Sequence, residues 1–376
     1  MTGGHVVIDN NESFVKSKEE FLRRKKILSK DQPYRWSTNL YYIINKGLDE
    51  KKIKEAFQRI ENRSCFKFIK TMKIIKNTQG FIFNSSTFLG TFFGNVVKNG
   101  YQYIYLRKND SFLSSRWIMH FILNALGMYH EHMRPDRGNF IRVNYENIDE
   151  SALDDFQLLN ASNVYSYGID YDLGSLLHYG PIAYSKQRQP TIEARLPPYN
   201  KMIGQKEKLS FNDIKLLNIH YCYNMCPKKL SCYNSGYQNP IQCKFCNCPN
   251  GYTGRQCEKI FFNKDNCDKK ELITKPTSQE IILKGAKSCT YAIYAPKDHI
   301  IKMRIKLVIF QQYRPCIERK GFEIKYRNDK GAMGLNLCEK YKDIYLKSEG
   351  NTVLIQYNGK RKQDKVVMTF KHASNV

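Results

Sequence analysis

In three stretches of the first 222 positions, the pattern of apolar residues predicts a helix. Between Asp49 and Asn62 they return every three or four residues, which predicts an amphipathic helix. The stretch Trp117–Leu126 is almost wholly apolar and predicts a buried helix that breaks at Gly127. A third helix is predicted within Gly204–Cys222, where Ser210 is a suitable N-cap.

Short runs rich in branched and aromatic residues lie between these helices and predict strands. The runs are Leu40–Ile44, Cys65–Phe68, Gly80–Phe83 and Gln102–Leu106. Helices and strands together in one stretch of chain indicate an α+β domain.

The last third of the chain shows a different pattern, with strand-like runs and no predicted helix. These runs are Ile300–Phe310, Phe322–Tyr326, Thr352–Tyr357 and Lys365–Phe370. They predict an all-β domain. A chain of 376 residues is long enough for two or three such domains.

Charge adds one constraint on partners. The chain holds 61 Lys and Arg against 35 Asp and Glu, a net charge of +26. The cations are spread over most segments, and no zinc-finger, helix-turn-helix or RNA-binding signature accompanies them. We therefore exclude nucleic acid and expect anionic matrix polymers or membrane surfaces as electrostatic partners.

The twelve cysteines are unevenly spaced. Seven of them crowd into residues 222–257, and four more follow at wider intervals. An even number with a dense cluster is typical of a disulfide framework in the secretory pathway. Sequons for N-glycosylation agree with this expectation and lie at Asn11, Asn62, Asn84, Asn109 and Asn160.

The first thirty residues contain no apolar run of the length that a signal peptide needs. Because the cysteines favour secretion, we expect this N-terminus to be incomplete or mis-assigned. No stretch of the sequence is long and apolar enough to predict a transmembrane helix.

The buried helix carries most of a metal site. Zinc sites of the H-E-x-x-H kind need two imidazoles at i and i+4, on one helix face, and a carboxylate beside the first as general base. A Gly then turns the chain, and a third His completes the ligands. Here His120, Gly127 and His130 hold the first-ligand, turn and third-ligand positions. Phe121 stands at the general-base position, and Asn124 stands at the second-ligand position.

The stretch from Arg116 to Arg137 resembles the astacin family of secreted zinc metallopeptidases. The family pattern H-E-x-x-H-x-x-G-x-x-H-E-x-x-R-x-D-R is matched at His120, Gly127, His130, Glu131, Arg134, Asp136 and Arg137. Residues further along resemble the family's S-x-M-H-Y turn, with matches at Ser175, His178 and Tyr179 and with Leu177 in place of the Met. The resemblance implies a metzincin-like α+β catalytic domain around a buried central helix.

The resemblance also implies roles for these residues. His120 and His130 would be metal ligands, and Tyr179 would be a possible stabiliser of the oxyanion. Phe121 cannot accept a proton, and Asn124 offers zinc only a neutral amide oxygen, so zinc is expected to be weakly bound or absent. We also expect the ring of Phe121 to convert the catalytic groove into an apolar pocket. Glu131 would face the processed N-terminus, so it would not replace the lost base.

His132 is a further imidazole close to the metal site. Residues at i and i+2 do not face one centre in regular structure, so His132 is expected to stay outside the ligand set.

Two further modules follow by resemblance. The cysteine cluster, with its Gly251–Gly254 turn, is similar to an EGF-like module, and the segment after Cys267 is similar to a CUB sandwich. The expected boundaries are 1–34 for an N-terminal remnant pro-segment, 35–222 for the peptidase domain, 223–258 for the EGF-like module and 267–372 for the CUB domain. The disulfides implied by the three resemblances are Cys65–Cys222, Cys226–Cys243, Cys232–Cys246, Cys248–Cys257, Cys267–Cys289 and Cys316–Cys338.

Three functions remain open from the sequence. The first is a secreted pseudoprotease that binds extracellular proteins or peptides without cutting them, because Phe121 and Asn124 each impair hydrolysis. The second is a metalloendopeptidase with residual, zinc-dependent peptide hydrolysis. The third is a basic matrix-binding protein, whose binding to anionic polymers would depend on salt and survive chelation.

Overall fold

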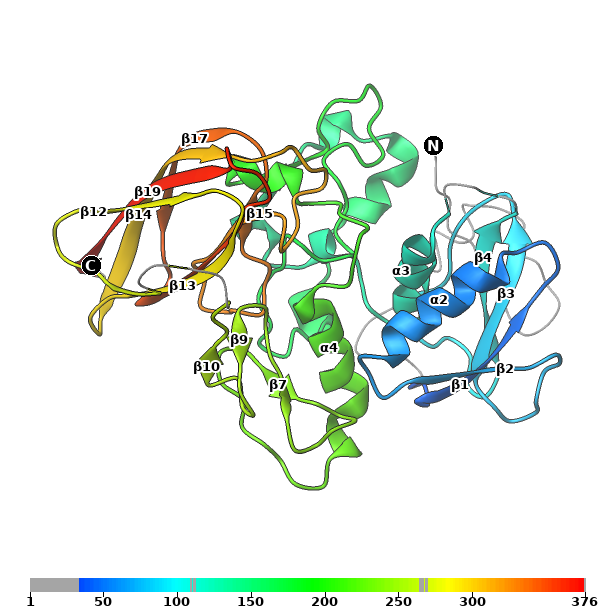
Figure 1. Ribbon diagram of the computed structural model, residues 1–376. Coiled ribbons are helices and arrows are strands. Elements are labelled where there is room, and N and C mark those ends of the chain that lie inside the picture. Colours follow the sequence, from blue (N-terminus) through cyan, green and yellow to red (C-terminus); the bar gives the residue numbers. More distant parts are fainter. Residues whose placement is uncertain (1–33, 109, 111–112, 264–266, 268–269, 375–376) are drawn as a thin grey trace.

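The computed structural model describes residues 34–374, except 109, 111–112, 264–266 and 268–269. Apart from Tyr34, the expected N-terminal segment lies outside the described residues, as do the sequons at Asn11 and Asn109. Figure 1 shows a sheet with two helices at one end of the molecule and a β-sandwich at the other, joined by a long segment of short helices and loops.

The N-terminal sheet has the strand order β2-β1-β3-β4, and its three strand pairs are parallel. Its strands are β1 (Asn39–Ile44), β2 (Lys67–Lys70), β3 (Gly80–Ser86) and β4 (Tyr101–Arg107). Each overlaps one of the four predicted runs, although β2 begins two residues later than predicted. β2 and β4 are the two edges of this sheet.

Helices α2 (Glu50–Glu61) and α3 (Ser115–Ala125) contact each other beside this sheet (Figure 1). Asp49 caps α2 by accepting a hydrogen bond from the backbone N–H of Lys52. Ser114 caps α3, so this helix begins two residues before the predicted start. Most residues of α3 are buried, which confirms the prediction of a buried central helix.

The segment between α3 and α4 (Phe211–Cys222) is mostly loops and single-turn helices. Its elements are η2 (Glu131–Met133), η3 (Arg137–Asn139), β5 (Ile141–Val143), η4 (Tyr145–Asn147), η5 (Glu150–Phe156), η6 (Ala161–Asn163), β6 (Ile192–Ala194) and η7 (Pro197–Lys201). β5 and β6 form an antiparallel pair. Helix α4 begins directly after the predicted N-cap Ser210, which forms a capping box with Asp213.

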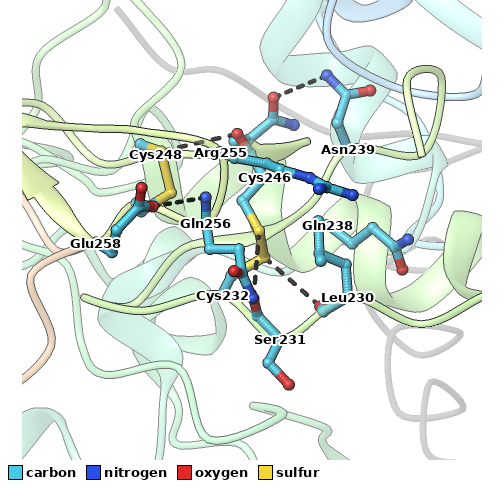
Figure 2. The surroundings of a disulfide bond; sticks show 12 residues. Leu230, Ser231, Cys232, Gln238, Asn239, Cys246, Cys248, Arg255, Gln256 and Glu258 are labelled. Carbon is cyan, nitrogen blue, oxygen red and sulfur yellow. Dashed lines mark hydrogen bonds between the residues drawn. A yellow bond between two sulfur atoms is a disulfide. The ribbon is translucent and has the colours of Figure 1, made fainter. Parts of the chain in front are cut away.

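A small disulfide-rich module follows α4 and the short helix η8 (Tyr223–Met225). It consists of two antiparallel pairs of two-residue strands, β7 (Tyr237–Gln238) with β8 (Cys246–Asn247), and β9 (Tyr252–Thr253) with β10 (Lys259–Ile260). Three disulfides link this module internally. Figure 2 shows the Cys232–Cys246 bond and the side chain of Gln256, whose Nε2 donates to the carbonyl oxygen of Ser231.

Two sheets form the C-terminal sandwich, with strand orders β11-β13-β18-β15-β16 and β12-β19-β14-β17. Their strands are β11 (Glu271–Ile273), β12 (Gln279–Lys284), β13 (Ser288–Tyr294), β14 (His299–Ile309), β15 (Gly321–Lys325), β16 (Leu335–Leu337), β17 (Tyr341–Lys347), β18 (Thr352–Asn358) and β19 (Lys365–Ser374). Four of them were predicted, and the others were missed. The remaining disulfides are Cys65–Cys222, Cys267–Cys289 and Cys316–Cys338, so all six bonds join the pairs that the resemblance implied.

The buried apolar residues form two clusters. One contains the N-terminal sheet, α2, α3 and α4. The other joins the sandwich to the segment before α4, so that Tyr171 and Tyr199 share a core with Met333 and Leu335. The sandwich is therefore packed onto the loops that follow α3.

Candidate functional site

Helix α3 places His120, Phe121 and Asn124 in the interior. Each of the three side chains is no more than 3% exposed. Phe121 packs near Trp117 and belongs to the cluster that includes α2 and α4. The prediction of an apolar pocket at Phe121 is therefore wrong, because neighbouring side chains cover its ring.

His130 returns to α3 after a tight turn. Gly127 has a φ of +93°, a conformation that favours glycine, and its N–H donates to the carbonyl oxygen of Asn124. This turn brings Nε2 of His130 to 3.1 Å from Nε2 of His120 and to 3.4 Å from Nδ2 of Asn124. The two imidazoles and the amide that the sequence placed at one site therefore do meet.

Lys206 contacts the other side of the His120 ring. Its Nζ donates to the carbonyl oxygen of Leu176 at 2.7 Å and lies 3.3 Å from Nδ1 of His120. Burial lowers the pKa of Lys206 to about 7. Nδ1 also lies 3.3 Å from the carbonyl oxygen of Leu176, which only accepts, so the two contacts at Nδ1 require different tautomers of His120.

The two Nε2 atoms share a hydrogen bond, so one of them carries a proton. The amide nitrogen of Asn124 is a donor and faces Nε2 of His130. A metal bound by this pair would displace the shared proton, since only a neutral lone pair is a ligand.

His132 and Tyr179 stack beside the pair. Their ring centroids are 4.0 Å apart, and the Tyr179 ring lies 4.6 Å from that of His130. Nε2 of His132 bonds the carbonyl oxygen of Asp155 at 2.9 Å. Burial and a hydrogen bond with Tyr184 raise the pKa of Tyr179 well above 10.

The charged residues after His130 hold the loop in place. Arg134 makes a bidentate pair with Asp136 at 2.9 and 2.8 Å. Arg137 donates to two backbone carbonyls, those of His132 and Phe156. The matched part of the motif beyond His130 is thus a network that supports the loop.

Glu131 faces a separate cavity. Its Oε1 accepts from the backbone N–H of Asp172 at 2.8 Å and lies 3.6 Å from Arg134. Burial raises the pKa of Glu131 to about 8. The cavity has a volume of about 460 Å³, and Tyr34, Arg35, Glu131, Arg134, Tyr167 and Tyr221 are among its lining residues. Glu131 therefore does not take the place of the missing base.

The loop from Tyr171 to Tyr179 lies beneath the pair and is tied to α4. Asp213 accepts from Oγ of Ser175 at 2.6 Å and from the backbone N–H of Leu176 at 2.9 Å. His178 bonds the hydroxyl of Tyr171 at 2.7 Å, and burial lowers its pKa to about 4. Leu177, at the position of the family's Met, is buried in the core.

The donor set at this site falls short of what zinc requires. Protein sites hold zinc through three or four Cys, His, Asp or Glu side chains. Within the described part of the chain, no three such side chains are grouped to hold one ion. Oδ1 of Asn124 is buried without a hydrogen-bond partner, but a neutral amide oxygen is a poor zinc ligand. The residues present do not fit a catalytic zinc site, so we derive no step through this metal.

Comparison with known proteins places the chain in a family. Residues 28–222 match the family model described as Astacin, a peptidase family. The chain belongs to the astacin family. Its relatives are named zinc metalloproteinases, and against the family pattern His120 is a match, whereas Phe121 and Asn124 are departures.

Two curated relatives show how far this astacin-family similarity extends. Zinc metalloproteinase nas-34 of Caenorhabditis elegans is 30% identical over 355 residues, which cover 91% of this chain and 57% of the relative. Zinc metalloproteinase dpy-31 of the same organism is 33% identical over 231 residues, which cover 59% of this chain and 39% of the relative. The chain thus spans between two-fifths and three-fifths of the length of these relatives.

Among solved structures, the chain is similar to high choriolytic enzyme 1, a hatching-enzyme zinc protease of medaka fish. The sequence identity is 25% and the TM-score is 0.44, with 50% of this chain and 94% of that chain covered. In the described residues of this astacin-family chain, no helix has both the length and the apolar character needed to cross a membrane.

Sequence reasoning missed two residues of this site. Lys206 is separated from His120 by 86 positions, and it lies in a charged stretch that carries no helical or metal signal. Asp213 was passed over because it is inside a predicted helix, although its place three residues after Ser210 is the signature of a capping box.

Proposed function

We propose that this chain is a secreted, astacin-like pseudoprotease that binds extracellular proteins or peptides without hydrolysing them. The observation that carries the proposal is the presence on α3 of Phe121 at the general-base position and of Asn124 at the second-ligand position. Both side chains are buried beside His120. His120 and His130 are thus left with a neutral amide as their neighbour.

The general-base position supports the same conclusion. Hydrolysis needs a group that takes a proton from water, and a phenyl ring has no such group. Glu131, the next carboxylate along the motif, is bonded to the backbone of Asp172 and faces another cavity. Loss of a general base typically lowers the rate by about 10²- to 10⁴-fold.

The disulfides and the C-terminal modules support a role in extracellular binding. All twelve cysteines are paired, which fits an oxidising compartment. We assign the module at 223–258 as EGF-like and the sandwich at 267–372 as a CUB domain. Sandwiches of this kind present loops and edges to partner proteins, so these modules would supply binding surfaces.

A metalloendopeptidase with residual activity is the second candidate. The Nε2 atoms of His120 and His130 are 3.1 Å apart, close to the ~3.3 Å between two nitrogens on a tetrahedral zinc with Zn–N bonds of 2.0–2.1 Å. Zinc bound here would displace the proton that the two imidazoles share, and any hydrolysis would stop when a chelator is added.

Restoring the two altered positions tests the proposal. The wild-type protein and the double variant Phe121→Glu/Asn124→His would be assayed on a fluorogenic peptide library with and without EDTA, and Phe121→Gln/Asn124→Gln is the matched control. We expect EDTA-sensitive cleavage only from the double variant. EDTA-sensitive cleavage by the wild type would overturn the proposal in favour of the second candidate. A double variant that binds zinc but stays inert would show that other parts of the site have also changed.

A further inference from the structure

The segment Lys67–Lys76 combines exposed apolar side chains with a regular series of lysines. Its sequence is KFIKTMKIIK, in which every third residue is Lys and most of the others are apolar. No acidic residue lies within it. All four lysines are exposed, and the segment extends from the edge strand β2 into the connection to β3.

Apolar side chains in this segment point into solvent. Met72 is 87% exposed, the highest value for any large apolar side chain among the described residues, and Ile74 is 60% exposed. Ile69 and Ile75 are also exposed. Single exposed apolar residues are common on protein surfaces, but four within seven positions are a cluster that calls for a partner.

Hydrogen bonds hold the segment in a defined shape. Oγ1 of Thr71 donates to the carbonyl oxygen of Lys73 at 3.0 Å, and Oγ1 of Thr78 donates to that of Ile75 at 2.7 Å. The backbone N–H of Ile75 donates to the hydroxyl of Tyr101, on β4. The exposed side chains are therefore presented by a supported turn.

Charge indicates which kind of partner fits. Glu50 pairs with Lys70, whereas Lys67, Lys73 and Lys76 form no ion pair with any residue that the structure describes. The exposed apolar side chains are aliphatic, and lysines alternate with them along the segment. This pattern suits an interface that is apolar at its centre and anionic around it. An anionic lipid surface has both properties, since its acyl chains lie beneath phosphate and carboxylate groups.

We propose that the Lys67–Lys76 segment docks the protein onto anionic lipid bilayers. Met72 and Ile74 enter the boundary between headgroups and acyl chains, and Lys67, Lys73 and Lys76 bind headgroup anions. Docking here uses none of the residues of the histidine pair, so this inference is independent of whether the pair binds zinc.

Flotation of the full chain with lipid vesicles tests the proposal. The vesicles would be phosphatidylcholine with or without phosphatidylserine. The variants are Met72→Ser/Ile74→Ser and Lys73→Gln/Lys76→Gln. The matched controls make the same changes of charge and polarity at exposed positions on the sandwich. They are Ile273→Ser/Ile282→Ser and Lys342→Gln/Lys347→Gln. Equal thermal unfolding of all variants would show that each one folds.

We expect the wild type to float only with vesicles that contain phosphatidylserine. The lysine variant should lose at least about tenfold in partitioning, because each Lys near such a surface contributes about fivefold. The Met72→Ser/Ile74→Ser variant should lose at least as much, because it no longer buries two apolar side chains. The controls should stay within about twofold of the wild type. Absence of flotation, or equal losses in segment variants and controls, would overturn the proposal. Binding to heparin beads through these same lysines, with no binding to vesicles, would overturn it in favour of an anionic polymer.

Discussion

The Nζ atom of Lys206 lies 3.3 Å from Nδ1 of His120, the ring nitrogen that does not face His130. The same Nδ1 lies 3.3 Å from the carbonyl oxygen of Leu176, and the Nε2 atoms of His120 and His130 share one proton. The remains of the metal site thus form a chain of hydrogen bonds.

Asn124→His alone should restore zinc binding without restoring hydrolysis. The substitution places a third imidazole one helical turn after His120, which completes the ligand set, while Phe121 still offers no base. Zinc content measured after dialysis should rise to near one ion per chain, and the matched variant Asn124→Gln should remain low. A zinc-free Asn124→His protein would show that the geometry around His130 no longer accommodates the metal.

The sandwich and the loop beneath the histidine pair should be energetically coupled through Gly174 and Met333. A Cβ on Gly174 would lie 2.5 Å from Sδ of Met333, so Gly174→Ala should lower the free energy of unfolding by about 1–3 kcal/mol. Met333→Ala should cost about 2–5 kcal/mol by itself, since Met333 is buried.

A double-mutant cycle measured by urea unfolding isolates this coupling. Met333→Ala removes Sδ and Cε, two of the three atoms that the new methyl group would meet, and leaves Cβ at 2.6 Å. The double variant should therefore be more stable than the sum of the two single changes predicts. Strict additivity would mean that Gly174 and Met333 do not share one packed site.

The stability should depend on pH through Asp172. Burial, followed by the nearby Asp213, raises the pKa of Asp172 from 3.8 to about 6. A carboxyl group with a raised pKa stabilises the fold fully at low pH, and that contribution is lost as the pH rises through about 6. The free energy of unfolding of Asp172→Asn, relative to that of the wild type, should therefore rise by up to about 3 kcal/mol between about pH 4 and pH 7.

Urea unfolding at a series of pH values measures this difference. Asp154→Asn removes an exposed carboxylate and serves as the matched control for the change of charge. A difference for Asp172→Asn that shrinks with rising pH would contradict the assignment.

Asp213→Ala should be more harmful than loss of an ordinary helix cap. Asp213 closes the capping box of α4 and also accepts from Ser175 and from the backbone of Leu176, in the loop below the histidine pair. Its removal leaves buried donors unsatisfied, at a cost of about 1–3 kcal/mol in addition to the cap. Asp49→Ala removes only an exposed cap of α2 and should cost about 1 kcal/mol. Equal losses, measured by thermal unfolding, would show that Asp213 acts only as a cap.

Local patterns predicted much of this fold. The apolar run before Gly127 located α3 to within two residues, because a helix buried on most sides leaves a continuous apolar signal. The cap at Ser210 fixed the start of α4. The missed strands β11 and β16 are three residues long, too short for an alternating pattern to be visible.

Contacts between distant parts of the chain could not be predicted in the same way. Lys206 meets His120 only because the loop below α3 folds back on it, and the backbone of Met333 reaches Asp172 across 161 positions. The burial of Phe121 depends on such contacts too, which is why its ring was wrongly expected to line a pocket. No local pattern reports which side chains cover a residue from elsewhere in the chain.

Zinc content of the wild-type chain tests the central claim most directly. The protein would be purified from a secreting host without added metal and analysed for zinc by elemental analysis, with Asn124→His prepared in parallel as the positive control. The hydrogen-bonded pair of His120 and His130 predicts a value far below one ion per wild-type chain. A value near one, lost on mutation of His120 or His130 to Ala, would contradict the claim and favour a zinc enzyme.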